Sequence, residues 1–165
     1  MNRCALAIGL LIFLCQSTTG PATQEIAFTV LPSAQVTHLA GGLCSRDVPG
    51  HVSSGWDPTP TQVAQAEARL PGFVVKNRDK TRDRQPPKPF DQYVRQYLGV
   101  VIDDETFIYV NLFPRDIVES RARFGKEPDD WRSTFVVVCD GGASFWGVLF
   151  DPRTLRFFSP RFNGS

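Results

Sequence analysis

The stretch from Tyr93 to Phe113 reads YVRQYLGVVIDDETFIYVNLF and decides what kind of fold the chain can form. Its two runs are rich in β-branched and aromatic residues, and the acidic residues 103–105 separate them, which is typical of two antiparallel strands joined by a tight turn. Because side chains alternate between the faces of a strand, Tyr93, Arg95 and Tyr97 share one face. We therefore expect a hairpin at the centre of a sheet.

A second hairpin is predicted near the C-terminus. Residues 134–139 (TFVVVC) and 144–150 (SFWGVLF) both resemble strands, and Asp140-Gly141 between them is a favoured hairpin dipeptide because glycine readily adopts a positive φ. The turn sequence DPRT then leads into a last strand, Leu155–Phe158. We expect these three strands to form a β-meander.

One helix is clearly encoded, at Thr59–Leu70. Thr59 is a suitable N-cap, Pro60 occupies the first helical position, where its missing N–H costs nothing, and Gln62 completes a capping box. Pro71-Gly72 is expected to end this helix. Elsewhere the sequence predicts a short strand at 25–31, a loop at 33–57 and a helical turn that ends near Gly125.

Together these elements predict an α+β fold in which one main helix packs on a curved antiparallel sheet of roughly four to six strands. The outline is reminiscent of cystatin-like and nuclear-transport-factor-2-like folds, although a shared topology does not give a function. Apolar residues make up 42% and charged residues 21% of the 165 residues, as in ordinary globular proteins. We expect a single domain over 23–165, which is long enough to bury a core.

The N-terminal segment 1–22 has the layout of a secretory signal peptide. Arg3 precedes the apolar run ALAIGLLIFLC, which is too short to span a bilayer as a stable anchor, and small polar residues follow. A lipoprotein acylated at Cys15 is an alternative, but Leu14 stands where a small residue is expected. We expect a periplasmic or secreted protein of a bacterial envelope with no transmembrane span in its mature form.

Removal of this segment would leave Cys44 and Cys139 as the two cysteines of the mature chain. Two cysteines in an oxidising compartment normally bond to each other, so we expect a Cys44–Cys139 disulfide. The alternative is a catalytic Cys139, which would need a neighbouring base. The two histidines, His38 and His51, are both far away in the sequence, and this favours the disulfide.

The charge of the chain narrows the choice of partners. The formal net charge of +1 gives no sign of a nucleic-acid partner, whose binders usually carry a clear basic excess. The segment Lys76–Lys88 holds six basic and two acidic residues. It is expected to be a solvated loop, and the alternative is a docking site for an acidic partner or an anionic surface.

Four residues are candidates for binding a partner. Tyr93, Arg95 and Tyr97 form a row on one strand face, and tyrosine and arginine concentrate binding energy at interfaces. Trp131, which follows Asp129 and Asp130, could add an aromatic contact. The alternative for Arg95 is an internal role, paired with Asp140 or another acid.

The acidic residues give only weak signs of chemistry. Asp103, Asp104 and Glu105 are adjacent on a turn, where their side chains diverge, whereas a calcium loop spaces its ligands along a wrapping segment. A pair of carboxylates could hydrolyse glycosidic bonds in an envelope, but the sequence does not reveal their separation. No nucleotide, metal or hydrolase motif occurs, so no cofactor and no metal are predicted.

The amino-acid sequence of the C-terminal half resembles that of a group of small exported bacterial proteins of unknown function. These proteins pair a Tyr-x-Arg-Gln-Tyr strand with a Cys-Asp-Gly-Gly and Phe-Trp-Gly-Val hairpin, and the similarity covers Tyr93–Gly164. The resemblance implies export and a compact domain, and no activity, substrate or cofactor.

The sequence thus favours a non-enzymatic domain that binds a protein or envelope partner, in the manner of an inhibitor or immunity protein. The alternatives are an envelope hydrolase that uses carboxylates and a structural accessory of an envelope complex.

Overall fold

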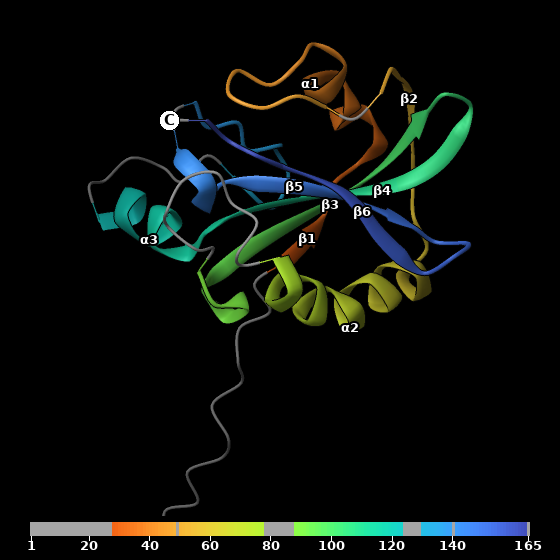
Figure 1. Cartoon of the computed structure of the whole chain (residues 1–165). Coiled ribbons are helices and arrows are strands. Elements are labelled where there is room, and N and C mark those ends of the chain that lie inside the picture. Colours follow the sequence, from red (N-terminus) through yellow and green to blue (C-terminus); the bar gives the residue numbers. More distant parts are fainter. Residues whose placement is uncertain (1–27, 49, 78–87, 124–129, 140, 165) are drawn as a thin grey trace, which may run out of the picture.

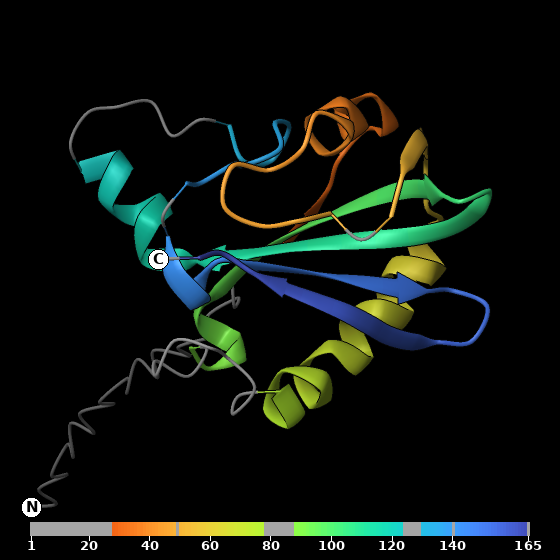
Figure 2. The same ribbon diagram turned by 45° about the horizontal axis from the view of Figure 1, so that its top comes forward.

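A six-stranded mixed sheet forms the centre of the protein in the computed structural model, which describes residues 28–48, 50–77, 88–123, 130–139 and 141–164. The strands are β1 (Phe28–Val30), β2 (Val52–Trp56), β3 (Tyr93–Ile102), β4 (Glu105–Pro114), β5 (Trp146–Asp151) and β6 (Arg156–Phe162). The helices are α1 (Thr37–Ala40), α2 (Pro60–Asn77) and α3 (Arg115–Arg123), and the short 3-10 helices are η1 (Ser33–Val36), η3 (Phe90–Gln92) and η4 (Gly142–Ser144). Helix α2 covers one face of the curved sheet, and α1 with its neighbouring loops covers the other (Figures 1 and 2). The α+β prediction is confirmed.

The predicted central hairpin is formed by β3 and β4. They pair along their whole length, from Tyr93 opposite Pro114 to Ile102 opposite Glu105. The turn is shorter than expected, because Glu105 belongs to β4 and only two residues remain. Asp103 and Asp104 both have positive φ, at 50° and 66°, which is the backbone of a tight turn that matches the twist of its strands. Asp103 and Asp104 therefore form the turn between β3 and β4.

Two short strands share the other edge of β3, and their pairing changes the expected topology. β1 runs parallel to the first half of β3, so the sheet is mixed and not purely antiparallel. β2 runs antiparallel to the second half of β3. The prediction of a loop over 33–57 was wrong, since η1, α1 and β2 lie there. The stretch VSSGW lacks the alternation of a typical strand, and Gly55 is needed because a Cβ there would collide with the Ser33 carbonyl.

Helix α2 begins as the sequence predicts and ends later. The Thr59 N–H donates to the Gln62 side chain at 2.9 Å, and the Gln62 N–H donates to the Thr59 hydroxyl at 3.3 Å, so the capping box is confirmed. The helix then continues through Pro71 to Asn77, which corrects the predicted end. Proline removes one helical hydrogen bond, but Phe73 and Val74 keep the apolar face of the helix on the sheet beyond it. Burial of that face outweighs the missing bond.

The core beneath α2 combines small and aliphatic helix residues with large aromatic residues of the sheet. Its buried members are Val63, Ala66, Leu70, Val74, Tyr93, Tyr97, Ile108, Val110, Leu112, Trp146, Val148 and Phe150. Phe73 stacks on Trp146 with 6.4 Å between ring centroids and packs on Phe157 at 5.3 Å. Each large side chain buried here stabilises the fold by roughly 2 kcal/mol.

Beside α1 and its loops, an extended segment that is not a strand covers part of the opposite face. Residues 134–139 form no strand, so the predicted hairpin of 134–139 with 144–150 was wrong. Instead β5 pairs with β4 and β6, and the last strand, β6, is longer than predicted. We call Trp131–Cys139 the covering segment, because it crosses this face beside a second core of aliphatic and aromatic residues.

Side-chain amides replace sheet pairing in holding the covering segment. The Gln96 amide donates to the carbonyls of Trp131 and Thr134 at 2.6 and 2.7 Å and accepts from the Val136 N–H at 2.9 Å. The Asn111 amide donates to the Val136 carbonyl at 2.9 Å. Because buried backbone groups must find partners, these two amides allow a non-strand segment to lie on a sheet.

A disulfide joins the covering segment to the loop that follows α1. Cys44 and Cys139 are bonded, with Cα atoms 5.4 Å apart and 95 positions between them in the sequence. This confirms the predicted pair. Both cysteines are exposed, so the bond links two surface segments and does not belong to either core.

Helix α3 confirms the helical turn expected before Gly125. The predicted signal peptide, most of the basic loop 76–88, Asp129 and Asp140 lie outside the described residues. Within the part that the structure describes, no helix is long and apolar enough to cross a membrane.

The position of the disulfide leads to a test of stability. Replacing both cysteines, Cys44→Ser with Cys139→Ser, is expected to lower the free energy of unfolding by about 2–5 kcal/mol, because the unfolded chain regains the freedom that the cross-link removed. Urea titration followed by tryptophan fluorescence measures this loss. Far-ultraviolet circular dichroism should stay native, since the cysteines lie outside both cores, and equal stability of the two proteins would contradict the prediction.

Candidate functional site

The row of Tyr93, Arg95 and Tyr97 lies beneath α2. Their relative exposures are 0%, 6% and 0%. The three residues do share one face of β3, as alternation predicts, but this face belongs to the core. They do not form an exposed strip in this structure, which corrects that expectation, because the predicted helix covers the strip.

Arg95 has an internal partner in Glu67 of α2. The Arg95 Nε donates to one Glu67 carboxylate oxygen at 2.8 Å, and Nη2 donates to the other at 3.3 Å. Nη1 donates to the Tyr93 carbonyl at 2.9 Å, and the guanidinium lies 4.5 Å from the centre of the Phe90 ring. The internal role that the sequence allowed is therefore present, with Glu67 as the acid.

Tyr97 completes this buried cluster by donating its hydroxyl to Glu67. Burial raises the pKa of Tyr97 well above its ordinary value, and the nearby Glu67 carboxylate raises it further. The phenol therefore stays protonated over the physiological range and remains a donor. The spacing of Val63, Glu67 and Leu70 on one helix face could have revealed Glu67 as a polar residue turned toward the sheet.

Trp131, the fourth candidate, is also buried, at 5% exposure. Its ring packs edge-on against Phe113 with 6.5 Å between centroids, and the Arg132 guanidinium lies 4.4 Å from its centre. It fixes the start of the covering segment to the sheet and does not form a surface contact in this structure.

The disulfide removes Cys139 as a free thiol. His38, one of the two possible bases, stacks on Phe135 at 6.2 Å, and His51 lies elsewhere, at the rim of a cavity. The structure thus does not assemble a cysteine–histidine pair at Cys139.

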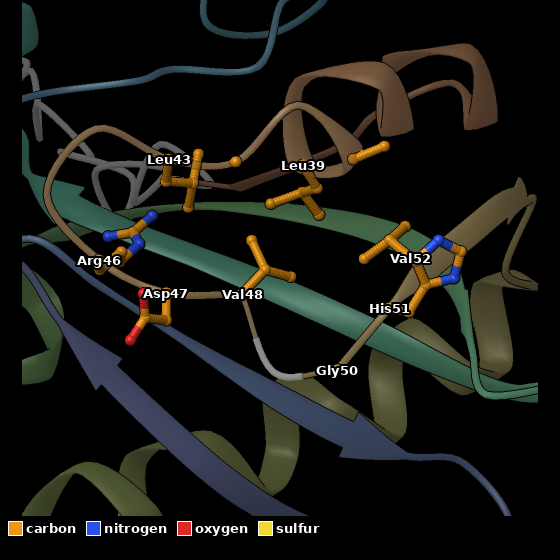
Figure 3. A pocket seen from close by; sticks show the side chains of 10 residues that line it. Leu39, Leu43, Arg46, Asp47, Val48, Gly50, His51 and Val52 are labelled. Carbon is orange, nitrogen blue, oxygen red and sulfur yellow. The ribbon is translucent and has the colours of Figure 1, made fainter.

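That cavity is the best candidate for a functional site in the described part of the chain. It has a volume of about 370 Å³ and is lined by Leu39, Ala40, Gly42, Leu43, Arg46, Asp47, Val48, Gly50, His51 and Val52. Figure 3 shows these residues on α1, the loop that follows it and the start of β2. Arg46 lies at one end of the cavity and His51 at the other. The sequence predicts a loop in this region and gives no sign of the cavity.

Arg46 is held in place from the sheet side of the cavity. Its Nη2 donates to the Asn111 side-chain oxygen, and its Nη1 donates to the Asn163 side-chain oxygen at 3.1 Å. The Asn163 amide donates in turn to the Val138 carbonyl at 2.7 Å. Asn111 and Asn163 thus connect Arg46 to the covering segment and fix the guanidinium beside the cavity.

Two polar atoms near this arginine are buried without a hydrogen-bond partner among the described residues. They are the Arg46 Nε and the Tyr109 hydroxyl. Burial raises the pKa of Tyr109, while the neighbouring Arg46 opposes the rise. The Tyr109 hydroxyl lies against Gly147, where a Cβ would collide with it, so the glycine makes room for the ring. Both atoms are shielded from solvent, and the two side chains interact with each other electrostatically.

The Asp151 carboxylate has a structural role. Burial alone would raise the pKa of Asp151, but hydrogen bonds from Arg153 and Thr154 lower it below its ordinary value. Asp151 thereby holds the turn between β5 and β6. Within the described residues no cluster of three or more metal-binding side chains occurs.

The first prediction from this site concerns the buried ion pair. Arg95→Met leaves the Glu67 carboxylate, whose side chain is 19% exposed, without its cation, and should lower the free energy of unfolding by on the order of 2–4 kcal/mol. Glu67→Gln with Arg95→Met should recover part of the loss. Lys88→Met is the matched control, because its pair with Asp116 is exposed and should cost less than about 1 kcal/mol. Equal losses from Arg95→Met and Lys88→Met in urea titrations would contradict the internal role.

The second prediction concerns alkaline pH. The pKa values of Tyr97 and Tyr109 are raised above 10.0 in the folded protein, whereas the unfolded chain ionises near that value. The unfolded state therefore binds fewer protons above about pH 10, and each tyrosine lowers the free energy of unfolding by about 1.4 kcal/mol per pH unit there. Below pH 10 this contribution is fully present. Tyr97→Phe should give a shallower fall in alkaline urea titrations, and an unchanged slope would show that the buried phenol is not responsible.

Comparison of the chain with protein-family models, curated proteins and solved structures finds no match.

Proposed function

We propose that the chain is an exported binding domain and not an enzyme, and that it binds a protein or another envelope component at the cavity between Leu39 and Val52. The cavity itself carries this proposal. Aliphatic side chains line part of it, and the polar side chains of Arg46, Asp47 and His51 line the rest. Arg46 is fixed in place, so the site can orient a polar group beside a small apolar one.

The loop around the cavity is held at several points. It lies between α1 and β2, Cys44 ties it to the covering segment, and the Ser45 carbonyl accepts from the Gly164 N–H at 2.9 Å. A binding loop that is already ordered loses less conformational entropy when a partner binds. This arrangement supports recognition of the inhibitor or immunity type, in which loops on a rigid scaffold make the contacts.

The polar groups with an assigned role in the described residues support binding more than catalysis. Cys139 is bonded to Cys44, Glu67 is neutralised by Arg95, and Asp151 holds a turn. None of these three is placed beside the cavity as a nucleophile or a base. Asp47 and His51 do line the cavity, but Figure 3 shows them at opposite ends of it, so they do not form a paired acid and base.

Export is supported by the disulfide. Such bonds form and persist mainly outside the cytoplasm, and the Cys44–Cys139 bond joins two exposed segments that a reducing compartment would separate. Together with the sequence of segment 1–22, this supports a periplasmic or secreted location.

The proposed function is tested by blocking the cavity. Ala40 is exposed and lines the cavity at the end of α1, so Ala40→Phe should fill the entrance without disturbing the core. A photo-reactive residue at Asp47, on the rim, should form a cross-link to the partner in producing cells when the cavity is open. Ala40→Phe should reduce this cross-link by about tenfold or more, as the loss of a central contact does.

The matched control is Ala34→Phe, which makes the same change at an exposed alanine of η1 that does not line the cavity. It should leave the cross-link unchanged. Cross-linking that is insensitive to Ala40→Phe, or equally sensitive to both variants, would refute the cavity as the binding site. Denaturant titration of both variants confirms that they are folded.

A further inference from the structure

We infer that the cavity takes a carboxylate carried on a short aliphatic body, and that Arg46 is the residue that recognises the carboxylate. This inference rests on the proposed function and specifies the chemistry of the ligand. It follows from a comparison of two arginines in the same molecule, from the direction of the hydrogen bonds around Arg46 and from the composition of the cavity wall.

The two arginines differ in how their charge is balanced. The Arg95 guanidinium is buried and both oxygens of the Glu67 carboxylate face it, at 2.8 and 3.3 Å. The Arg46 guanidinium is partly buried, but its acceptors are the neutral amide oxygens of Asn111 and Asn163. Among the described residues no carboxylate forms an ion pair with Arg46. A partly buried cation without a counter-ion is unfavourable, and an anion that enters the cavity would relieve this cost.

The side-chain amides of Asn111 and Asn163 are held in one orientation by their other hydrogen bonds. The nitrogen of Asn111 donates to the Gln96 oxygen and the Val136 carbonyl, both at 2.9 Å. The nitrogen of Asn163 donates to the Val138 carbonyl. Each amide oxygen must therefore face Arg46, and this fixes two of its nitrogens. Nε is buried close to the Tyr109 side chain, so the groups left for a ligand are the second hydrogens of Nη1 and Nη2. Charge-assisted bonds from these hydrogens to a carboxylate would balance the charge of Arg46.

The wall of the cavity selects the body of the ligand. Its larger apolar residues, Leu39, Leu43, Val48 and Val52, are branched and aliphatic, and its described lining residues include no Phe, Tyr or Trp. In Figure 3 Leu39, Leu43 and Val48 point toward the centre of the cavity, whereas the Asp47 carboxylate points away from it. Sugars and nucleobases are usually held by aromatic faces, so this wall suits an aliphatic chain. A volume of about 370 Å³ limits that chain to a short one.

Two sources could supply this chemistry, a free short-chain carboxylate and the carboxyl end of a polypeptide with an aliphatic last residue. The test uses the oxidised mature chain and follows amide chemical shifts during titration. Hexanoate is compared with hexanol and hexylamine, which change only the head group. Acetyl-Gly-Leu with a free carboxylate is compared with the same dipeptide as its amide.

We expect hexanoate to bind at least about tenfold more tightly than hexanol, with the largest shifts in residues 39–52, because the carboxylate gains charge-assisted hydrogen bonds that the alcohol lacks. Hexylamine should bind less tightly than hexanol. Arg46→Gln should abolish the preference for hexanoate, and Arg161→Gln, which removes the same charge from an exposed position on β6, should keep it. If only the dipeptide acid binds, the ligand is a chain end, and the inference holds in that form.

Equal affinities within both pairs, hexanoate with hexanol and the acid dipeptide with its amide, would overturn the inference. This holds even if Arg46→Gln fails to fold, because these arms use the unaltered chain. If the probes bind with no preference for an anion and Ala40→Phe blocks them, the proposed binding site stands and the assignment to Arg46 fails. If Ala40→Phe leaves both the probes and the cross-link unaffected, the proposed function fails as well.

Discussion

Strand β3 is the element on which the rest of the structure depends. It pairs with β4 along its whole length and with β1 and β2 along its other edge, so its backbone has no free edge to offer. Its side chains alternate between two faces that are both buried, and each face therefore needs a cover that is not a strand of the same sheet. Helix α2 covers one face, and the covering segment with α1 and its loops covers the other.

The two covers stabilise the sheet by different physics. Helix α2 satisfies its own backbone and contributes an apolar face, so it can lie directly on aromatic side chains of the sheet. The covering segment has no ladder of its own and relies on Gln96 and Asn111, which the sheet places beneath it. The neighbouring loop packs Leu43 and Val48 against the core on this side and is also tied by the disulfide. The cavity lies on this second side.

The features that the sequence predicts well are those decided by nearby residues. The central hairpin, the capping box of α2 and the helical turn after β4 follow from alternation, side-chain capping and local composition, and all three are present. The errors concern competition between distant segments. Helix α2 passes through Pro71 because Phe73 and Val74 have a sheet to pack on, and residues 134–139 form no strand because β5 pairs with β4 and β6. Neither fact can be read from the residues involved alone.

The candidate site was missed for a related reason. Arg46 and His51 lie in a stretch of small and polar residues with no period, and such a stretch reads as a solvated loop. Asn111 and Asn163, which fix Arg46 beside the cavity, are more than sixty positions away in the sequence. Conversely, Tyr93, Arg95 and Tyr97 have the composition of an interface. They lie in the core because helix α2 covers them and its Glu67 pairs with Arg95. Composition therefore identifies residues that are able to bind a partner. Whether such a residue is available to a partner depends on whether its charge is already paired within the protein. Arg95 is neutralised by Glu67, whereas no carboxylate of the described residues forms an ion pair with Arg46.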